Sequence, residues 1–176
     1  MRKQGKPVLG EKEQELIAVG ASIASGCLPC TQFHLRLAAS VGASRDEILQ
    51  SVEDAAGVRL AATEIMAAAG RSSSAGATLK RPALVGTPSQ LRELAAIAAA
   101  YALNCTTGLE AHMKAARALG ATDKQMFAAL KIACAVREAA GQKARVVAGS
   151  NLGVGEAEAL ACGGETNDGG KGDCRC

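Results

Sequence analysis

The second half of this chain repeats the first half. Three residue types recur at one offset of 78 positions (93 − 15, 105 − 27 and 112 − 34), as Glu15 and Glu93, Cys27 and Cys105, and His34 and His112. The same offset aligns Gly42-Ala43 with Gly120-Ala121 and Val58-Arg59 with Val136-Arg137. Spaced identities at one fixed offset indicate an internal repeat. We therefore expect two copies of one structural unit around a shared core.

The apolar residues favour an all-α fold. Hydrophobic residues make up 48% of the chain, yet aromatic residues make up only 2% and Trp is absent. Alanine fills most of the apolar positions, and its small side chain lets helices approach closely. Valine and isoleucine do not form alternating runs, so strands are poorly supported.

Charge and hydropathy exclude two classes of partner. A formal charge of +3 is too small to commit the chain to nucleic acid, and one Tyr with two Phe cannot build a base-stacking surface. No apolar run reaches the roughly 18–20 residues of a membrane span. The basic N-terminus lacks the apolar core of a signal peptide, so we expect a cytoplasmic protein. Its seven cysteines are then expected to be reactive or metal-binding rather than structural.

Breaks and capping signals divide the chain into four segments. Residues 1–69 form the first repeat, with helices expected over 11–25, 27–41 and 45–69, the last beginning at a capping box from Ser44 to Glu47. Residues 70–90, rich in Gly, Ser and Pro, are expected to be a linker. Residues 91–148 form the second repeat, where Thr122 to Gln125 is a second capping box. Residues 149–176 are expected to be a Gly- and Cys-rich flexible tail.

Four residues of the first repeat form the candidate catalytic site. Cys27 and Cys30 are close enough in sequence to form a reversible disulfide, and a helix N-terminus at this position would stabilise a thiolate. His34 follows Cys30 by one helical turn and could accept its proton. Glu15 lies on the preceding helix, and an antiparallel packing would bring its carboxylate to His34. This array predicts thiol redox chemistry that needs no cofactor and no bound metal.

Several alternatives remain open. Cys27, Cys30 and His34 could be part of a zinc site, although no second ligand pair lies at finger-like spacing. The second repeat has Gly108 in place of the second cysteine, so it is either a structural copy or a separate pocket with the lone thiol of Cys105. The tail cysteines could bind a soft metal, exchange with the active disulfide or be inert, and they are Cys162, Cys174 and Cys176. Arg59 and Arg137 are expected to be ion-pair partners.

The complete array resembles the carboxymuconolactone decarboxylase superfamily, and within it the alkylhydroperoxidase D-like branch. The matching residues are Glu15, the stretch from Gly26 to His34 and the stretch from Gly42 to Ile48, and about residues 7–148 fit two copies of that family's helical unit. The resemblance implies an all-α homo-oligomer, either a trimer of two-repeat chains or a hexamer of single repeats.

The same resemblance implies a thiol-dependent peroxidase or disulfide reductase, and it implies a role for each site residue. Hydroperoxides would be reduced by the cysteine pair, with Cys30 attacking and Cys27 resolving. His34 and Glu15 would relay the proton. A lipoyl-bearing protein or another dithiol carrier would restore the pair. Lactone decarboxylases of the superfamily lack the cysteine pair, so a lyase is the less favoured alternative to the peroxidase. A metal-binding protein is the other alternative.

Overall fold

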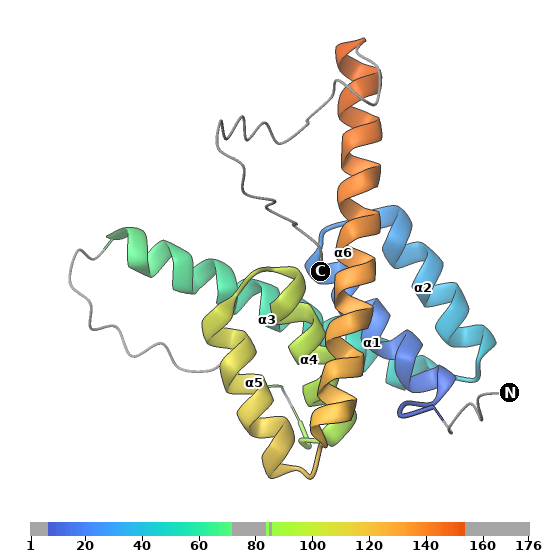
Figure 1. The fold of residues 1–176 in the computed structure, drawn as a ribbon, viewed down its shortest axis with the longest axis vertical. Helices are drawn as coiled ribbons and strands as arrows, with labels where there is room; N and C mark the ends of the chain where they lie inside the picture. The colour runs from blue at the N-terminus through green and yellow to red at the C-terminus, as the bar shows by residue number, and fades with distance from the viewer. Residues whose placement is uncertain (1–6, 72–83, 85, 154–176) are drawn as a thin grey trace, which may run out of the picture.

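The computed structural model describes residues 7–71, 84 and 86–153, and within these it contains six α-helices and no strand. The helices of the first repeat are α1 (Glu11–Ala24), α2 (Leu28–Ser40) and α3 (Arg45–Arg71). Those of the second are α4 (Gln90–Ala102), α5 (Thr106–Ala118) and α6 (Asp123–Leu152) (Figure 1). The expected all-α fold with two tandem helical units is confirmed. None of these six helices is long and apolar enough to cross a membrane.

The turn between the first two helices of each repeat has the same backbone geometry in both copies. Gly26 and Asn104 both adopt a left-handed conformation, with φ of 69° and 56°. The next residue is a cysteine, whose N–H donates to a carbonyl five residues earlier: Cys27 to Ser22 at 3.3 Å and Cys105 to Ala100 at 2.9 Å. This closure satisfies a carbonyl at the end of one helix and places the cysteine at the N-cap of the next.

The capping boxes begin the third helix of each repeat, as the sequence predicts. Ser44 N–H donates to Glu47 Oε2 at 2.8 Å, and Glu47 N–H donates to Ser44 Oγ at 3.2 Å. Thr122 and Gln125 make the same reciprocal pair at 2.9 and 3.3 Å. Each box satisfies backbone N–H groups that have no partner within the helix.

Helices α1 and α4 pack against each other at the centre of the molecule. Their buried side chains include Ile17, Leu94 and Ile97, none of them more than 1% exposed. Gly20 of α1 lies so close to α4 that an added Cβ would come within 3.2 Å of the carbonyl oxygen of Ala95. The small residues therefore allow the close approach that an alanine-rich core requires.

The long third helix of each repeat crosses to the other repeat. Helix α3 packs against both α1 and α4, and α6 likewise packs against both α4 and α1. The C-terminal parts of α3 and α6 extend past the central helices in Figure 1. The two repeats are therefore interlocked rather than arranged as separate domains, and residues from α6 can contribute to a site in the first repeat.

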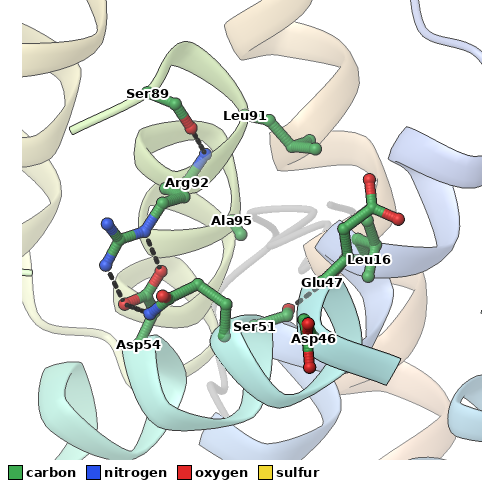
Figure 2. Close-up of a pocket in the computed structure, with 10 residues that line it drawn as sticks. Leu16, Asp46, Glu47, Ser51, Asp54, Ser89, Leu91, Arg92 and Ala95 are labelled. Carbon is green, nitrogen blue, oxygen red and sulfur yellow. Dashed lines mark hydrogen bonds and ion pairs between the residues drawn. The ribbon is translucent and has the colours of Figure 1, made fainter. Parts of the chain in front are cut away.

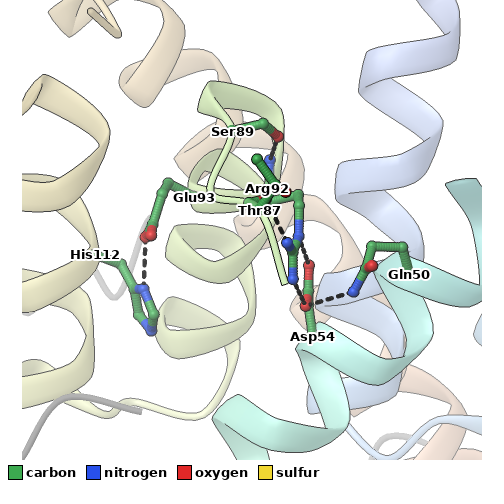
Figure 3. A network of polar contacts seen from close by, with 7 residues as sticks. All are labelled: Gln50, Asp54, Thr87, Ser89, Arg92, Glu93 and His112. Carbon is green, nitrogen blue, oxygen red and sulfur yellow. Dashed lines mark hydrogen bonds and ion pairs between the residues drawn. The ribbon is translucent and has the colours of Figure 1, made fainter. Parts of the chain in front are cut away.

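A buried ion pair also joins the repeats. Arg92 of α4 binds Asp54 of α3 through two hydrogen bonds, from Nε at 2.7 Å and from Nη2 at 2.6 Å (Figure 3). Gln50 donates to the same carboxylate at 3.0 Å, and Arg92 also donates to the carbonyl of Thr87 at 2.6 Å. The hydrogen bonds with Asp54 raise the pKa of Arg92. A bidentate pair of this kind fixes the orientation of α3 relative to α4.

The segment boundaries differ from the prediction at two places. Helix α3 runs to Arg71, and α6 continues through residues 149–152, which the sequence assigned to the tail. Asn151 Nδ2 donates to the carbonyl of Val147 at 2.8 Å, and Gly153 ends the helix in a left-handed conformation. These contacts carry the helix past the Gly-rich boundary. The remaining tail residues, including Cys162, Cys174 and Cys176, lie outside the described residues, as does most of the linker.

Candidate active site

A disulfide joins Cys27 and Cys30 at the N-terminus of α2, with their Cα atoms 5.3 Å apart. Cys27 is the N-cap of this helix, and its sulfur accepts the N–H of Cys30 at 3.4 Å. Pro29 lies in the first turn, where a missing N–H is tolerated. Cys27 is 9% exposed and Cys30 is 5% exposed. A thiolate formed here would face the positive end of the helix dipole.

Glu15 and His34 form a pair, and His34 follows Cys30 by one turn of α2. Glu15 Oε2 lies 2.9 Å from His34 Nδ1, so the carboxylate on α1 reaches the imidazole on α2. The His34 side chain is 17% exposed and that of Glu15 is 19% exposed. A carboxylate at Nδ1 favours a proton on that nitrogen, which leaves Nε2 as the basic atom of the ring. Glu15 of α1 and His34 of α2 are thus in contact, and the first turn of the same α2 carries the cysteine pair.

Arg59 of α3 stabilises the turn before the cysteines through hydrogen bonds. Its Nη1 donates to the carbonyl oxygens of Ile23 and Ala24, both at 3.0 Å. In the second repeat, Arg137 donates to Asn104 Oδ1 at 2.5 Å and lies over the ring of Tyr101, 5.5 Å from its centroid. The sequence predicted ion pairs for both arginines, but within the described residues Arg59 binds carbonyl oxygens at the end of α1 and Arg137 binds the side-chain oxygen of Asn104 in the turn after α4. A cation at a helix C-terminus satisfies carbonyls that have no partner within the helix.

A cavity of about 430 Å³ opens beside Cys27, and Cys30 does not line it. One wall is the turn from Ser25 to Pro29, and the other is the last part of α6 from Ala140 to Asn151. Most of the described residues that line it are apolar, and Lys143 is the one charged residue among them. Lys143 could not be predicted from the sequence, because it lies in the other repeat, 116 positions after Cys27 (143 − 27 = 116).

The second copy keeps the carboxylate and the imidazole but buries them completely. Glu93 Oε2 lies 2.8 Å from His112 Nδ1, and both side chains are 0% exposed (Figure 3). Within the described part of the chain, His112 Nε2 has no hydrogen-bond partner. Cys105 occupies the N-cap of α5, and its sulfur accepts the N–H of Gly108 at 3.4 Å, the distance that Cys27 and Cys30 show.

A second cavity, of about 350 Å³, lies between α1, α3 and α4 (Figure 2). Its charged lining residues are Asp46, Glu47, Asp54 and Arg92. Asp54 and Arg92 form an ion pair with each other, and Lys12 Nζ lies 2.7 Å from a carboxylate oxygen of Glu47. Because three of the four charged groups already have partners, this cavity offers less available chemistry than the cysteine site.

Within residues 7–71, 84 and 86–153, no group of three His, Cys, Asp or Glu side chains is arranged to hold a metal ion. The zinc interpretation therefore gains no support from this part of the chain.

The family model of the carboxymuconolactone decarboxylase family matches residues 2–71 and 83–148, one match for each repeat. The chain belongs to the carboxymuconolactone decarboxylase family. This result confirms the resemblance at the level of the superfamily and agrees with the two tandem helical units. Neither a curated protein nor a solved structure matches the chain. The family includes both decarboxylase and peroxidase branches, so the choice between them depends on the site.

Proposed function

We propose that this protein is a thiol-dependent peroxidase that reduces hydroperoxides through Cys27 and Cys30. The observation that carries the proposal is a disulfide-bonded cysteine pair at the N-terminus of α2, the helix that also carries His34 in a partly exposed pair with Glu15. Lactone decarboxylation would not require two cysteines in disulfide contact. The same site also suits reduction of small disulfides, which proceeds through the same pair of sulfurs.

The reaction begins with attack of the Cys30 thiolate on the distal oxygen of the hydroperoxide. The S–O bond forms as the O–O bond breaks, giving a sulfenic acid on Cys30 and an alkoxide that takes a proton to become the alcohol. The Cys27 thiolate then attacks the Cys30 sulfur. The S–S bond forms and hydroxide leaves, which becomes water on protonation. One hydroperoxide and two thiols thus give one alcohol, one water and one disulfide.

Proton transfer is assigned to His34, with Glu15 positioning it. The carboxylate at Nδ1 holds the orientation of the ring. Nε2 can accept the Cys30 proton and return it to the leaving oxygen. Partial exposure of both side chains leaves room for a substrate or a bridging water.

The partners are proposed by the same reasoning. A dithiol is needed to reduce the disulfide, supplied by a lipoyl-bearing protein or another dithiol carrier of the cytoplasm. A homo-oligomer, a trimer or a hexamer, would cover the apolar side chains on the extended parts of α3 and α6, where Met66 and Leu152 are both 72% exposed.

The test is single-turnover oxidation of the fully reduced protein by one equivalent of an organic hydroperoxide. Disulfide formation between Cys27 and Cys30 is followed by quenched peptide mapping. Glu15→Gln and His34→Ala should each slow this oxidation by at least about tenfold. Glu11→Gln removes an exposed carboxylate from the same helix and should leave the rate unchanged. Oxidation of the Glu15 and His34 variants at the unaltered rate would refute the relay, and turnover of a lactone after loss of both cysteines would favour the lyase.

A further inference from the structure

The cavity beside Cys27 gives access to one side of the active-site disulfide. Cys27 lines this cavity and Cys30 does not, so a thiol that binds there meets the Cys27 side of the bond. Attack at Cys27 forms a mixed disulfide and releases the Cys30 thiolate. Because Cys30 is the sulfur assigned to attack the hydroperoxide, the cavity is suited to the reductive half of the cycle.

The wall that α6 contributes is one face of that helix. Its small residues are Ala140, Ala144 and Ala148, which recur at every fourth position and therefore lie on one side of the helix. The polar residues of this wall are Lys143 and Asn151, separated by eight positions (151 − 143 = 8) and so by about 12 Å along the helix. An apolar cavity of about 430 Å³ with a few polar groups is typical of a site for a small molecule.

Lys143 has a positive charge that is available to a ligand. Its side chain is exposed and has no hydrogen bond or ion pair with another described residue. The residues three and four positions before and after it are alanines and valines, so no carboxylate on the adjacent turns of α6 can pair with it. An anion bound in the cavity would therefore meet an uncompensated cation.

The repeat associates this lysine with the copy that has the cysteine pair. Helices α3 and α6 begin at the same offset of 78 positions (123 − 45), and this offset places Ile65 of α3 at the position of Lys143 (143 − 78 = 65). Helix α3 packs against α4 as α6 packs against α1. Thus Lys143 accompanies the disulfide at Cys27, whereas the corresponding position for the lone Cys105 is apolar.

We propose that the cavity binds a small thiol or dithiol that carries a carboxylate, and that Lys143 selects this reductant by pairing with the carboxylate. The proposal rests on the proposed function, because it names the substrate class that reduces the Cys27–Cys30 disulfide. The apolar wall contacts the carbon chain of the thiol, and the sulfur of the thiol attacks Cys27. Lys143 is then a specificity-determining residue that the other repeat supplies.

The exchange balances with the thiol as its reductant. A thiolate attacks the Cys27 sulfur, and the bond between Cys27 and Cys30 breaks as the new S–S bond forms. A second thiolate, from another molecule or from the same dithiol, attacks the sulfur of the bound thiol and releases the Cys27 thiolate. Two thiols become one disulfide, and two electrons pass to the cysteine pair. The two protons that the thiols lose are taken up by Cys27 and Cys30.

The first experiment compares two matched thiols in the full-length Cys30→Ser protein, where a mixed disulfide on Cys27 cannot be resolved by Cys30. The probes are 3-mercaptopropionate, which carries a carboxylate, and 3-mercapto-1-propanol, which is neutral and similar in length. The reduced variant is equilibrated at low ionic strength with each thiol and its disulfide, and peptide mapping gives the occupancy of each cysteine. We expect the ratio of anionic to neutral adduct to be about two- to fivefold higher at Cys27 than at Cys105.

Cys105 is the internal reference, because it occupies the same N-cap position without a lysine on the packed helix. An arginine lies near both turns, Arg59 in one copy and Arg137 in the other, so the arginines do not distinguish the two sites. Lys143→Gln should abolish the preference at Cys27, and added salt should weaken it. An equal ratio at the two cysteines, a preference that survives Lys143→Gln, or no adduct on Cys27 with either thiol would each overturn the proposal.

A second measurement keeps both active-site cysteines in place. The rate at which each probe reduces the Cys27–Cys30 disulfide is compared between Lys143→Gln and the control Lys131→Gln. Lys131 is an exposed lysine of α6 that does not line the cavity, so the two variants have the same net charge. Lys143→Gln should slow reduction by 3-mercaptopropionate by about two- to fivefold and leave reduction by 3-mercapto-1-propanol unchanged. Equal slowing in the two lysine variants would reflect net charge alone and would overturn the proposal.

Both measurements use thiols and no hydroperoxide, so they can fail independently of the proposed function. Absence of a charge preference together with rapid oxidation of the reduced pair by hydroperoxide would overturn the role of Lys143 and leave the peroxidase intact. If hydroperoxide does not oxidise the pair, the proposed function fails, and a charge preference at Cys27 would support the same thiol site in a reductase of small disulfides.

Discussion

Gly108→Cys should create a second disulfide, because the second repeat already presents the other half of one. A Cβ placed on Gly108 would lie 3.1 Å from the sulfur of Cys105. In an unstrained disulfide, the Cβ of one cysteine lies about 3.0 Å from the sulfur of the other, given an S–S bond of about 2.05 Å and a near-tetrahedral angle at sulfur. The distance that is too short for ordinary packing is therefore the distance that a disulfide needs.

The stabilisation expected from this bond is modest. Closing a loop of four residues, 105–108, removes chain entropy worth about 2 kcal/mol from the unfolded state. The next nearest side-chain atom to the new Cβ is the Cβ of Ala100 at 3.6 Å, an ordinary contact that adds no strain. Oxidation of the variant should therefore raise its Tm by roughly 4–8 °C relative to its own reduced form.

The assay is equilibration of folded Gly108→Cys protein in a thiol–disulfide buffer, followed by thiol counting and peptide mapping. Equilibration removes slow access to the buried second site as an explanation for failure. Gly108→Ser places a similar side chain at the same position without a sulfur and controls for steric effects. If Gly108→Cys remains folded and keeps both thiols while Cys27 and Cys30 oxidise, the two copies do not share one N-terminal geometry and the reasoning is wrong.

Two further predictions concern paired carboxylates. Glu93→Ala should lower the free energy of unfolding by about 3 kcal/mol in urea denaturation, because it leaves His112 buried without its acceptor. Glu15→Ala changes a partly exposed site and should lower the free energy of unfolding by less than about 1 kcal/mol. Equal losses in the two variants would contradict the difference in burial. The hydrogen bond from Lys12 is the main cause that lowers the pKa of Glu47, so this carboxylate stabilises the fold above its unfolded-state pKa and loses that effect as the pH falls through its folded pKa. Glu47→Gln should therefore be less stable than the unaltered protein by under about 1 kcal/mol at neutral pH, and the difference should vanish once the pH has fallen below the folded pKa of Glu47. A gap that persists in acid would refute this assignment.

The contacts that the sequence predicted well are those within one repeat. The spacing from Glu15 to His34 and the capping boxes depend on local helix geometry, which spacing and residue type determine. The cavity beside Cys27 could not be predicted from the sequence, because one of its walls is α6 of the other repeat and its shape depends on how the two units pack together. The contacts of Arg59 were also missed, since nothing in its local pattern distinguishes a carboxylate partner from the carbonyls at the end of α1.

The two copies differ in access more than in geometry. The Glu–His distance is 2.9 Å in the first repeat and 2.8 Å in the second, and the sulfur at each N-cap accepts a backbone N–H at 3.4 Å. Burial separates them, since one pair is 17–19% exposed and the other is 0% exposed. A fully enclosed imidazole whose Nε2 lacks a partner among the described residues cannot exchange protons with a substrate. Restoring the missing cysteine should therefore restore a disulfide in the second copy without restoring rapid reaction with hydroperoxide.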